Sequence, residues 1–237
     1  MTPTLRQCLL AEVLGTAFLL IFGTGAVVVD EQAHNLGHGG VAAAFGLIVL
    51  IIIQGLGHVS GAHVNPAVTI GFWAAGRFPG RRVLPYVGAQ LAGAFIGSGL
   101  VWLLATPGSS LGATLPAHSA RQAFGIELGL TFWLMLIILR VTSSYYEQGL
   151  LVGLTISATV GLEALVGGPL SGASMNPARS LAPALLSGNL TSAWVYLAAP
   201  VAGVLLAVLA DRLLQVKPAT EDLASLQAAK ALRERDL

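Results

Sequence analysis

SGAHVNPA at residues 60–67 returns as SGASMNPA at residues 171–178, and each copy follows an apolar segment long enough to cross most of a bilayer. In both copies an Asn directly precedes a Pro. Asn is a preferred N-cap and Pro is pre-set for the first helical position, so each pair predicts the start of a helix. That start lies at the far end of a membrane segment, which predicts two half-helices folding back into the membrane. Irregular backbone at that depth must be buried by protein or border a water-filled cavity. The repeat therefore indicates a pore or a substrate site.

The composition is that of an integral membrane protein. Of 237 residues, 55% are hydrophobic and 10% are charged, and the mean hydropathy is +0.78, whereas a soluble domain has about 25% charged residues. The net charge of +1 indicates no nucleic-acid partner, and the single cysteine, Cys8, excludes an internal disulfide framework. Arg6 and the apolar run behind it resemble a signal peptide. Glu12 interrupts that run, however, and the segment has a counterpart later in the chain, so we expect it to be retained.

Apolar runs of about 20 residues predict six membrane-spanning helices. They fall at residues 8–29, 40–57, 83–105, 122–142, 149–166 and 193–214. Two shorter stretches, 66–75 and 177–187, begin at the Asn-Pro pairs, and each would span roughly 15 Å, half of the hydrocarbon core. The expected fold class is an all-α membrane protein with six transmembrane helices and two re-entrant half-helices.

The two halves of the chain also match outside this phrase. Glu12 and Thr16 open the first span as Glu127 and Thr131 open the fourth, and the third and sixth spans share the series Tyr86, Ala89, Ala92, Gly93 and Tyr196, Ala199, Ala202, Gly203. Three spans per half is an odd number, so the second half must be inverted relative to the first, with a site near the midplane. We expect a first half-repeat at 1–115 (helices 1–3 and the first half-helix), a second at 116–217, and a C-terminal tail at 218–237. The two half-repeats form a single channel domain.

The positions of Lys and Arg predict that both termini are cytoplasmic, since cytoplasmic loops carry an excess of these residues. If the termini share one side, that side holds Arg6, Arg77, Arg81, Arg82, Arg140, Arg212, Lys217, Lys230, Arg233 and Arg235. Arg121 lies on the opposite side and Arg179 lies inside the second short helix. The expected location is the cell (inner) membrane. The tail from Pro218 reads either as a short amphipathic helix capped by Thr220 or as a solvated, partly frayed segment.

The two Asn-Pro-Ala triplets, Asn65-Pro66-Ala67 and Asn176-Pro177-Ala178, suggest how such a pore could exclude charge. Half-helices from opposite sides would meet N-terminus to N-terminus, and each end carries roughly half a positive charge. Facing positive ends repel a cation and orient water with its oxygen toward Asn65 and Asn176, whose amides can donate to it and break a proton-conducting water chain. The alternative is that the triplets are only capped re-entrant turns.

With these motifs in place, the chain resembles the aquaporin (major intrinsic protein) family over nearly its whole length. The paired triplets, Arg179 directly after the second, and the glutamates Glu12 and Glu127 carry the resemblance. It implies a homotetramer in the lipid bilayer, with one pore per subunit that passes water or small neutral solutes down their gradients and needs no cofactor.

Arg179 is a cation within apolar sequence, which indicates function, because charge at that depth is costly. It needs carbonyl partners, and its remaining donors can bind a permeating oxygen while its charge repels cations. The alternative is an arginine that reaches to the membrane interface. By the resemblance, the family's selectivity filter falls at Phe45, Ala164, Ala173 and Arg179. Strict water channels in the family usually have His at the position of Ala164, so two alanines imply a wider, less polar constriction.

The family patterns that bear on the solute are mixed. The stretch GGPLSGASM at residues 167–175 resembles the nodulin-like branch of plants and its bacterial relatives. Tyr196-Leu197 stands where water channels tend to have an aromatic residue and Trp, yet Ser180 and Ala184 resemble water channels rather than glycerol facilitators. The branch is associated with water, glycerol, urea, ammonia and metalloid hydroxides such as arsenite or boric acid.

Buried glutamates are expected to serve the two re-entrant loops. Glu12 and Glu127 can accept hydrogen bonds from loop backbone that otherwise lacks partners, with proton relay as the rival role. Glu163 could brace the second loop or face the pore vestibule. His63 is expected to brace its loop rather than bind a metal ion. The backbone carbonyls expected to line the pore are those of Gly61, Ala62, His63, Val64, Gly172, Ala173, Ser174 and Met175. Six glycines are expected to allow close helix packing: Gly15, Gly46, Gly93, Gly97, Gly129 and Gly203.

One function of another class and one within the family remain as alternatives to a neutral-solute channel. A proton- or ion-coupled secondary transporter would use the same inverted repeat, with Glu12 and Glu127 as its paired protonatable groups. A strict water channel is the alternative within the family. An intramembrane enzyme lacks support, because the spans hold no paired Asp, no His cluster with metal spacing and no Ser-His combination.

Overall fold

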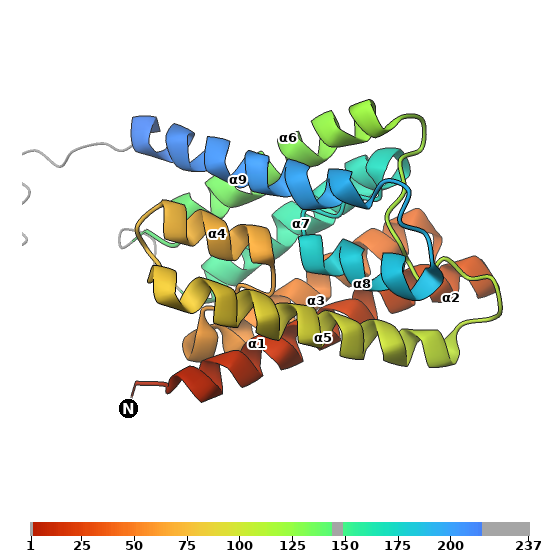
Figure 1. Ribbon diagram of the computed structural model, residues 1–237, viewed down its shortest axis with the longest axis horizontal. Helices are drawn as coiled ribbons and strands as arrows, with labels where there is room; N and C mark the ends of the chain where they lie inside the picture. Colours follow the sequence, from red (N-terminus) through yellow and green to blue (C-terminus); the bar gives the residue numbers. More distant parts are fainter. Residues whose placement is uncertain (1, 144–148, 215–237) are drawn as a thin grey trace, which may run out of the picture.

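The computed structural model describes residues 2–143 and 149–214, and these residues form helices and no β-strand (Figure 1). The elements are α1 (Leu5–Leu19), the π-helical turn η1 (Leu20–Thr24), α2 (Gly25–Ala33), α3 (Gly37–Ser60), α4 (Pro66–Ala74), the 3-10 turn η2 (Gly80–Arg82), α5 (Val83–Leu104), α6 (Ala120–Val141), α7 (Gly149–Ser171), α8 (Pro177–Ser187) and α9 (Ala193–Leu214). Six stretches are long and apolar enough to cross a membrane, the first running without a break from Leu5 to Ala33. The expected fold class is confirmed. The tail from Pro218 lies outside the described residues.

The half-helices begin where the Asn-Pro pairs predict, but two of the full spans, α3 and α7, end later than their apolar runs. α3 continues to Ser60 and α7 to Ser171, each ending at a glycine with positive φ, Gly61 (88°) and Gly172 (85°). Glycine adopts this left-handed conformation without the steric cost of a Cβ, which makes it a good helix terminator. The last turns of α3 and α7 are less apolar than the rest of these helices, so the predicted spans stop before the helices do. Both helices end at the first residue of the repeated phrase.

α7 passes through Pro169 because another residue replaces the missing backbone donor. Proline has no N–H, so the carbonyl of Leu165, one turn earlier, loses its helical partner. The imidazole Nε2 of His38, at the start of α3, lies 2.6 Å from that carbonyl oxygen and can donate to it. A Cβ on Gly168 would come within 2.7 Å of the same ring. His38 therefore joins α3 to α7 at the point where α7 lacks a hydrogen bond.

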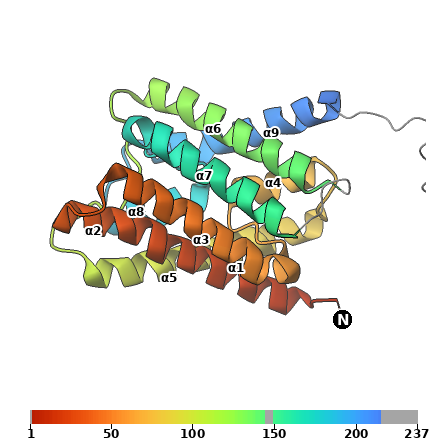
Figure 2. The same cartoon turned by 180° about the vertical axis from the view of Figure 1, so that it is seen from behind.

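The helices pack with the symmetry of an inverted repeat (Figures 1 and 2). α1 packs along α5 as α6 packs along α9, and α3 packs against α7 between the two halves. The half-helices cross over, since α4 contacts α9 and α8 contacts α5. Corresponding glycines bring the helices together: a Cβ on Gly93 would overlap the carbonyl of Val13, and one on Gly203 would come within 2.6 Å of the carbonyl oxygen of Leu128. The expectation for Gly129 is wrong, because a Cβ there would meet no described atom within 4 Å.

Charged residues connect the elements at the end of the bundle that holds the N-terminus and the end of α9, which we call the N-terminal face (Figure 2). Asp211 of α9 is buried and pairs with Arg77, which follows α4, at 3.3 Å and with Arg140 of α6 at 3.5 Å. Arg77 also donates to the carbonyl of Leu139 at 2.7 Å. These contacts fix the outer end of half-helix α4 against α6 and α9.

Candidate functional site

The two Asn-Pro pairs cap the half-helices as their residue types predict. The side-chain oxygen of Asn65 accepts from the amide of Ala67 at 2.9 Å, and that of Asn176 accepts from the amide of Ala178 at 3.0 Å. Pro66 and Pro177 take the first helical positions. Each asparagine thus uses its oxygen on its own helix and keeps its amide N–H groups for other partners.

Those amides join the two loops to each other. Asn65 Nδ2 donates to the carbonyl of Met175 at 2.8 Å, and Asn176 Nδ2 donates to the carbonyl of Val64 at 2.9 Å. Each amide therefore contacts the residue just before the other asparagine. An amide group has two N–H donors, so one on each asparagine remains for a molecule in the adjoining cavity. The N-termini of α4 and α8 face each other, which adds two positive helix ends at the same place.

The backbone of both loops alternates between ordinary and left-handed conformations. Positive φ angles occur at Gly61, Ala62 and Val64 in the first loop (88°, 48° and 43°) and at Gly172, Ala173 and Met175 in the second (85°, 41° and 54°). For non-glycine residues such conformations cost on the order of 1–3 kcal/mol each and persist only where surrounding contacts hold them. The four strained residues are Ala62, Val64, Ala173 and Met175, and they occupy matching positions in the two loops. Strain repeated in this way is typical of a functional site.

Glu12 supplies the contacts that hold the first loop. It is fully buried in α1. Its Oε1 accepts from the hydroxyl of Ser60 at 2.7 Å and the amide of His63 at 2.9 Å, and its Oε2 accepts from the amide of Val64 at 2.7 Å and from Nε2 of Gln90 at 2.7 Å. Charge-assisted hydrogen bonds of this kind are about twice as strong as neutral ones. They offset the strain of the loop and turn its amides away from the cavity.

Glu127 does the same for the second loop with one donor fewer. It accepts from the hydroxyl of Ser171 at 2.7 Å and from the amides of Ser174 at 2.9 Å and Met175 at 2.7 Å. The position that corresponds to Gln90 is Pro200, which has no side-chain donor. In place of that missing donor, the second loop has a contact between two hydroxyl groups: Oγ of Ser174 lies 2.5 Å from Oγ of Ser180.

His63 lies in a polar and aromatic setting behind the first loop. Its Nδ1 lies 3.1 Å from the hydroxyl of Thr69, and its ring contacts those of Phe72, Phe78 and Tyr86. Among the described residues, no group of three or more His, Cys, Asp or Glu side chains could hold a metal ion. The ring therefore fixes the loop to α4 and α5.

Arg179 follows the second triplet and is buried beside the cavity, with a relative exposure of 4%. Its Nη1 donates to the carbonyl of Gly112 at 2.5 Å, and the guanidinium lies over the ring of Phe45, 5.0 Å from the ring centroid. A cation–π contact with Phe45 and a hydrogen bond to the Gly112 carbonyl together hold the guanidinium in one place. Because Gly112 takes only one of its five N–H donors, Arg179 keeps donors for a permeating molecule.

The four residues expected at the constriction come from four different elements and border one cavity. Phe45 comes from α3, Ala164 from α7, Ala173 from the second loop and Arg179 from α8. Phe45 packs against Gly23 in the π-helical turn η1, where any Cβ would overlap its ring. The two alanines end at Cβ, so Phe45 and Arg179 are the bulky members of the set.

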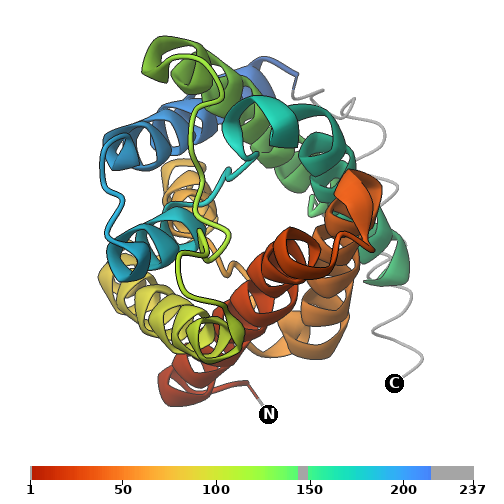
Figure 3. The ribbon, with the colours of Figure 1, turned by 90° about the vertical axis from the view of Figure 1, so that its right-hand side faces the viewer.

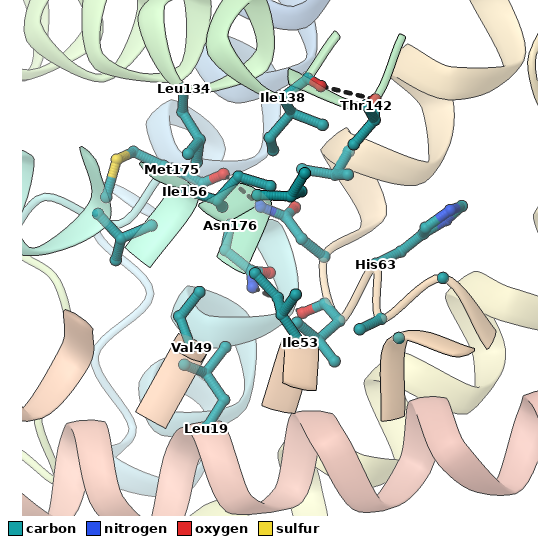
Figure 4. Close-up of a pocket in the computed structure, with 18 of the residues that line it drawn as sticks. Leu19, Val49, Ile53, His63, Leu134, Ile138, Thr142, Ile156, Met175 and Asn176 are labelled. Carbon is teal, nitrogen blue, oxygen red and sulfur yellow. Dashed lines mark hydrogen bonds between the residues drawn. The ribbon is translucent and has the colours of Figure 1, made fainter. Parts of the chain in front are cut away.

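The cavity that these residues border has a volume of about 760 Å³ and two kinds of wall. The two loops contribute backbone and the Asn65 and Asn176 side chains, whereas α3, α6 and α7 contribute mostly aliphatic side chains. Figure 4 shows Val49, Leu134 and Ile156 among the side chains that line the cavity together with Asn176. The cavity continues to His58, Arg77 and Thr142 near the N-terminal face. A path with one polar and one apolar wall can replace part of a small solute's hydration shell without binding it tightly.

Some residues that the sequence suggested do not border this cavity. Seven of the eight residues with expected pore-lining carbonyls do, but Gly172 does not, since its Cα faces Thr114. Glu163 neither braces the second loop nor borders the cavity. Its two carboxyl oxygens are buried without a hydrogen-bond partner in the described part of the chain.

Three residues near the site were missed by the sequence analysis. Gly112 and Thr114 come from the segment between α5 and α6, which has no motif; Gly112 binds Arg179, and Thr114 lies 2.7 Å from Ser180. Gln90 donates to both Glu12 and Thr69. A glutamine inside an otherwise apolar span was a signal that could have found it.

Comparisons with known proteins agree on one family. A family model described as "Major intrinsic protein" matches residues 1–210. The chain is 45% identical to "Aquaporin NIP1-1" of Zea mays, over 83% of this chain and 71% of that protein, and 42% identical to "Nodulin-26" of Glycine max, over 83% and 73%. The X-ray structure of the aquaglyceroporin from Plasmodium falciparum matches with a TM-score of 0.81 and 27% identity, covering 87% of this chain and 95% of that one.

Proposed function

We propose a range of solutes for this chain, which belongs to the major intrinsic protein family. It passes water, glycerol, urea and metalloid hydroxides such as arsenous or boric acid, and it excludes ions and protons. As a member of that family the protein is an integral membrane channel for water and small solutes, not an enzyme. The range of solutes and the exclusion of charge form the proposal.

The pairing of two alanines with one arginine and one phenylalanine at the constriction carries the proposal on solutes. Ala164 and Ala173 fill little of the space that Arg179 and Phe45 leave open. Arg179 offers hydrogen-bond donors, and Phe45 offers an apolar surface to the carbon face of a polyol. The similarity to nodulin-26 and to an aquaglyceroporin supports solutes larger than water.

The exclusion of charge rests on the region where the half-helices meet. Two positive helix ends and the buried Arg179 disfavour cations electrostatically. The spare N–H donors of Asn65 and Asn176 fix the orientation of a water between them, so that it cannot pass a proton along the chain of waters.

The observed contacts speak against the coupled transporter that the inverted repeat left open. Glu12 and Glu127 are fully buried, accept hydrogen bonds from loop amides and do not border the cavity. A coupling site needs groups that the transported ion can reach. The strict water channel is less favoured because Ala164 replaces the bulky side chain such a channel would need there.

The proposal also covers the oligomeric state of the protein and its orientation in the membrane. We infer a homotetramer with both termini in the cytoplasm of a cell carrying the channel in its inner membrane. Large apolar side chains on the outside, such as Trp102, Trp133 and Trp194, are each at least half exposed in the single chain and suit lipid or a neighbouring subunit. Native mass spectrometry of the detergent-solubilised protein tests the tetramer, and protease access to an N-terminal tag in sealed vesicles tests the orientation.

A panel of permeability measurements on proteoliposomes tests the range of solutes. Stopped-flow light scattering compares water, glycerol, urea and arsenous acid in vesicles with equal amounts of channel. We expect all four permeabilities to exceed those of empty vesicles. Permeability to water alone would replace this proposal with the strict water channel.

A further inference from the structure

The segment from Ala105 to Ser119 connects α5 to α6 and crosses the end of the bundle opposite the N-terminal face (Figure 3). It contacts the candidate pore at two points. The carbonyl of Gly112 accepts from Arg179, and the hydroxyl of Thr114 lies 2.7 Å from that of Ser180. The position of Arg179 therefore depends on how this segment is held.

Gly112 can be replaced only at the cost of moving its carbonyl. Its φ is +67°, and a Cβ on it would come within 2.8 Å of the Cβ of Thr24, at the end of the π-helical turn. The residue before it, Leu111, also has a positive φ of 55° and is 3% exposed. A leucine in this conformation is strained, so other contacts must hold the turn in place.

Two consecutive serines supply those contacts. The amide of Gly112 donates to the hydroxyl of Ser110 at 3.1 Å, and the amide of Leu111 donates to the hydroxyl of Ser109 at 3.2 Å. Because each hydroxyl accepts from an amide, its own proton is free to be donated elsewhere. Each of these two residues with positive φ is thus fixed by the serine two positions before it.

Both serine protons go to one carboxylate on α2. Ser109 donates to Oε2 of Glu31 at 2.9 Å, and Ser110 donates to Oε1 of the same side chain. Glu31 is therefore linked to Arg179 in three steps: Ser110 donates to Glu31, the amide of Gly112 donates to Ser110, and the carbonyl of Gly112 accepts from Arg179. The N–H and C=O of Gly112 belong to different peptide groups, so the link at this residue is the position of its backbone.

We propose that Glu31 is a positioning residue for the selectivity of the pore, acting on Arg179 through Ser110 and the Gly112 carbonyl. The proposal rests on the proposed function, since it takes Arg179 as part of the constriction. Glu31 itself does not border the cavity. Its carboxylate fixes the segment, the segment fixes the carbonyl, and the carbonyl fixes the guanidinium that solutes must pass.

The test measures the ratio of glycerol to water permeability, because loss of a channel lowers both values but does not change their ratio. Glu31→Ala should alter that ratio by about threefold or more, the effect expected when one ordinary hydrogen bond is lost at an exposed side chain. Ser110→Ala should alter it in the same direction, and the double variant should be no worse than the stronger single one. Glu31→Gln, which keeps one acceptor oxygen, should be intermediate. Gln32→Ala, on the exposed neighbour of Glu31, is the matched control and should leave the ratio unchanged.

A second background separates this proposal from the proposed function. In an Arg179→Val channel, Glu31→Ala should have no further effect on the ratio. An equal effect in both backgrounds, or no effect in the wild-type background, would overturn the role of Glu31. If Arg179→Val itself leaves the ratio unchanged, the constriction has been misplaced, and both the filter assignment and the role of Glu31 fail together. Size-exclusion profiles of the Glu31→Ala and Glu31→Gln channels check folding, and a well-folded Glu31→Gln channel keeps the test valid if the alanine variant aggregates.

Discussion

Asn176 donates its side-chain amide to the backbone carbonyl of Val64 at 2.9 Å, across the boundary between the two halves of the chain. The reciprocal bond from Asn65 to Met175 makes the contact nearly symmetric. The centre of the candidate site is thus a pair of loops, each holding the other in register. Disturbing one loop should therefore be felt in the other, and charge, width and accessibility at this centre can each be tested.

Removing the buried cation should relax the exclusion of charge. Arg179→Val deletes a guanidinium held by Gly112 and Phe45, so we expect a proton or cation current at least about tenfold above wild type, a loss of roughly 1.4 kcal/mol of barrier. A pH-sensitive dye inside proteoliposomes measures the proton flux. Arg121→Val, at the exposed start of α6, is the control. An equally proton-tight Arg179→Val channel would show that the barrier lies elsewhere.

Filling the space beside Ala164 should narrow the pore. Ala164→His is expected to lower glycerol and urea permeability far more than water permeability, because the imidazole projects into the cavity that Ala164 borders. Stopped-flow ratios of solute to water measure the effect. Leu162→His, on the outward side of the same helix with 59% exposure, should leave the ratios as in wild type. Equal ratios in both variants would place the constriction at other residues.

Thiol chemistry tests the position of the second loop. Cys8 is buried, with its thiol 3.1 Å from the carbonyl of Val59, so mercurials should leave wild-type water flux almost unchanged. Ala173→Cys should create a channel that mercurials block and a reducing agent restores. Ala105→Cys, at the end of α5, is the control and should stay open. An open Ala173→Cys channel whose labelling mass spectrometry has verified would mean that Ala173 does not lie in the path.

Loss of the carboxylate that holds the second loop should destabilise the protein. Glu127→Ala removes the acceptor for Ser171, Ser174 and Met175 and leaves two strained loop residues without support. We expect a loss on the order of 3 kcal/mol or more, since each bond to a charged group contributes about 1.5–3 kcal/mol. Thermal unfolding in detergent measures the change. Glu31→Ala, at an exposed carboxylate, is the comparison and should cost much less.

The imidazole that completes α7 offers a milder test. His38→Ala leaves the Leu165 carbonyl without the donor that Pro169 cannot supply. The expected loss is about 1 kcal/mol, together with a small change in the solute-to-water ratio, because Ala164 is the neighbour of Leu165. Thermal unfolding and stopped-flow measurements are compared with His34→Ala, at the exposed end of α2. Equal unfolding temperatures and equal permeability ratios in the two variants would show that His38 does not stabilise α7.

The starts of the half-helices could be predicted from local sequence, whereas the end of α7 could not. Both half-helices start where they were predicted, at Pro66 and Pro177, because an Asn-Pro pair specifies a helix start through two adjacent residues. The half-helix predicted at 177–187 also ends as predicted, and the one predicted at 66–75 ends one residue earlier. The end of α7 was predicted at 166 and lies at Ser171, because the donor that carries the helix past Pro169 comes from His38, far away in sequence. Membership of the family, the all-α class and the six spans are confirmed.

Contacts from the segment between α5 and α6 were beyond prediction. Nothing in its sequence shows that Gly112 would meet Arg179 or that Ser109 and Ser110 would meet Glu31, since these pairs form only after the bundle has closed. The roles of Phe45, Ala164, Ala173 and Arg179 in selectivity stay predictions, as do the half-repeat boundaries. For Glu163 the sequence left two roles open, and neither is observed: its buried carboxyl has no hydrogen-bond partner among the described residues and does not border the cavity.

Passive movement of neutral solutes, without accompanying protons, can be examined in one proteoliposome experiment. Water and glycerol fluxes are recorded by stopped flow while an internal dye reports pH, with and without imposed proton and sodium gradients. We expect fluxes that follow only the osmotic or solute gradient and a dye signal equal to that of empty vesicles. Solute flux that rises with an imposed proton or sodium gradient, or protons that accompany water, would contradict this expectation.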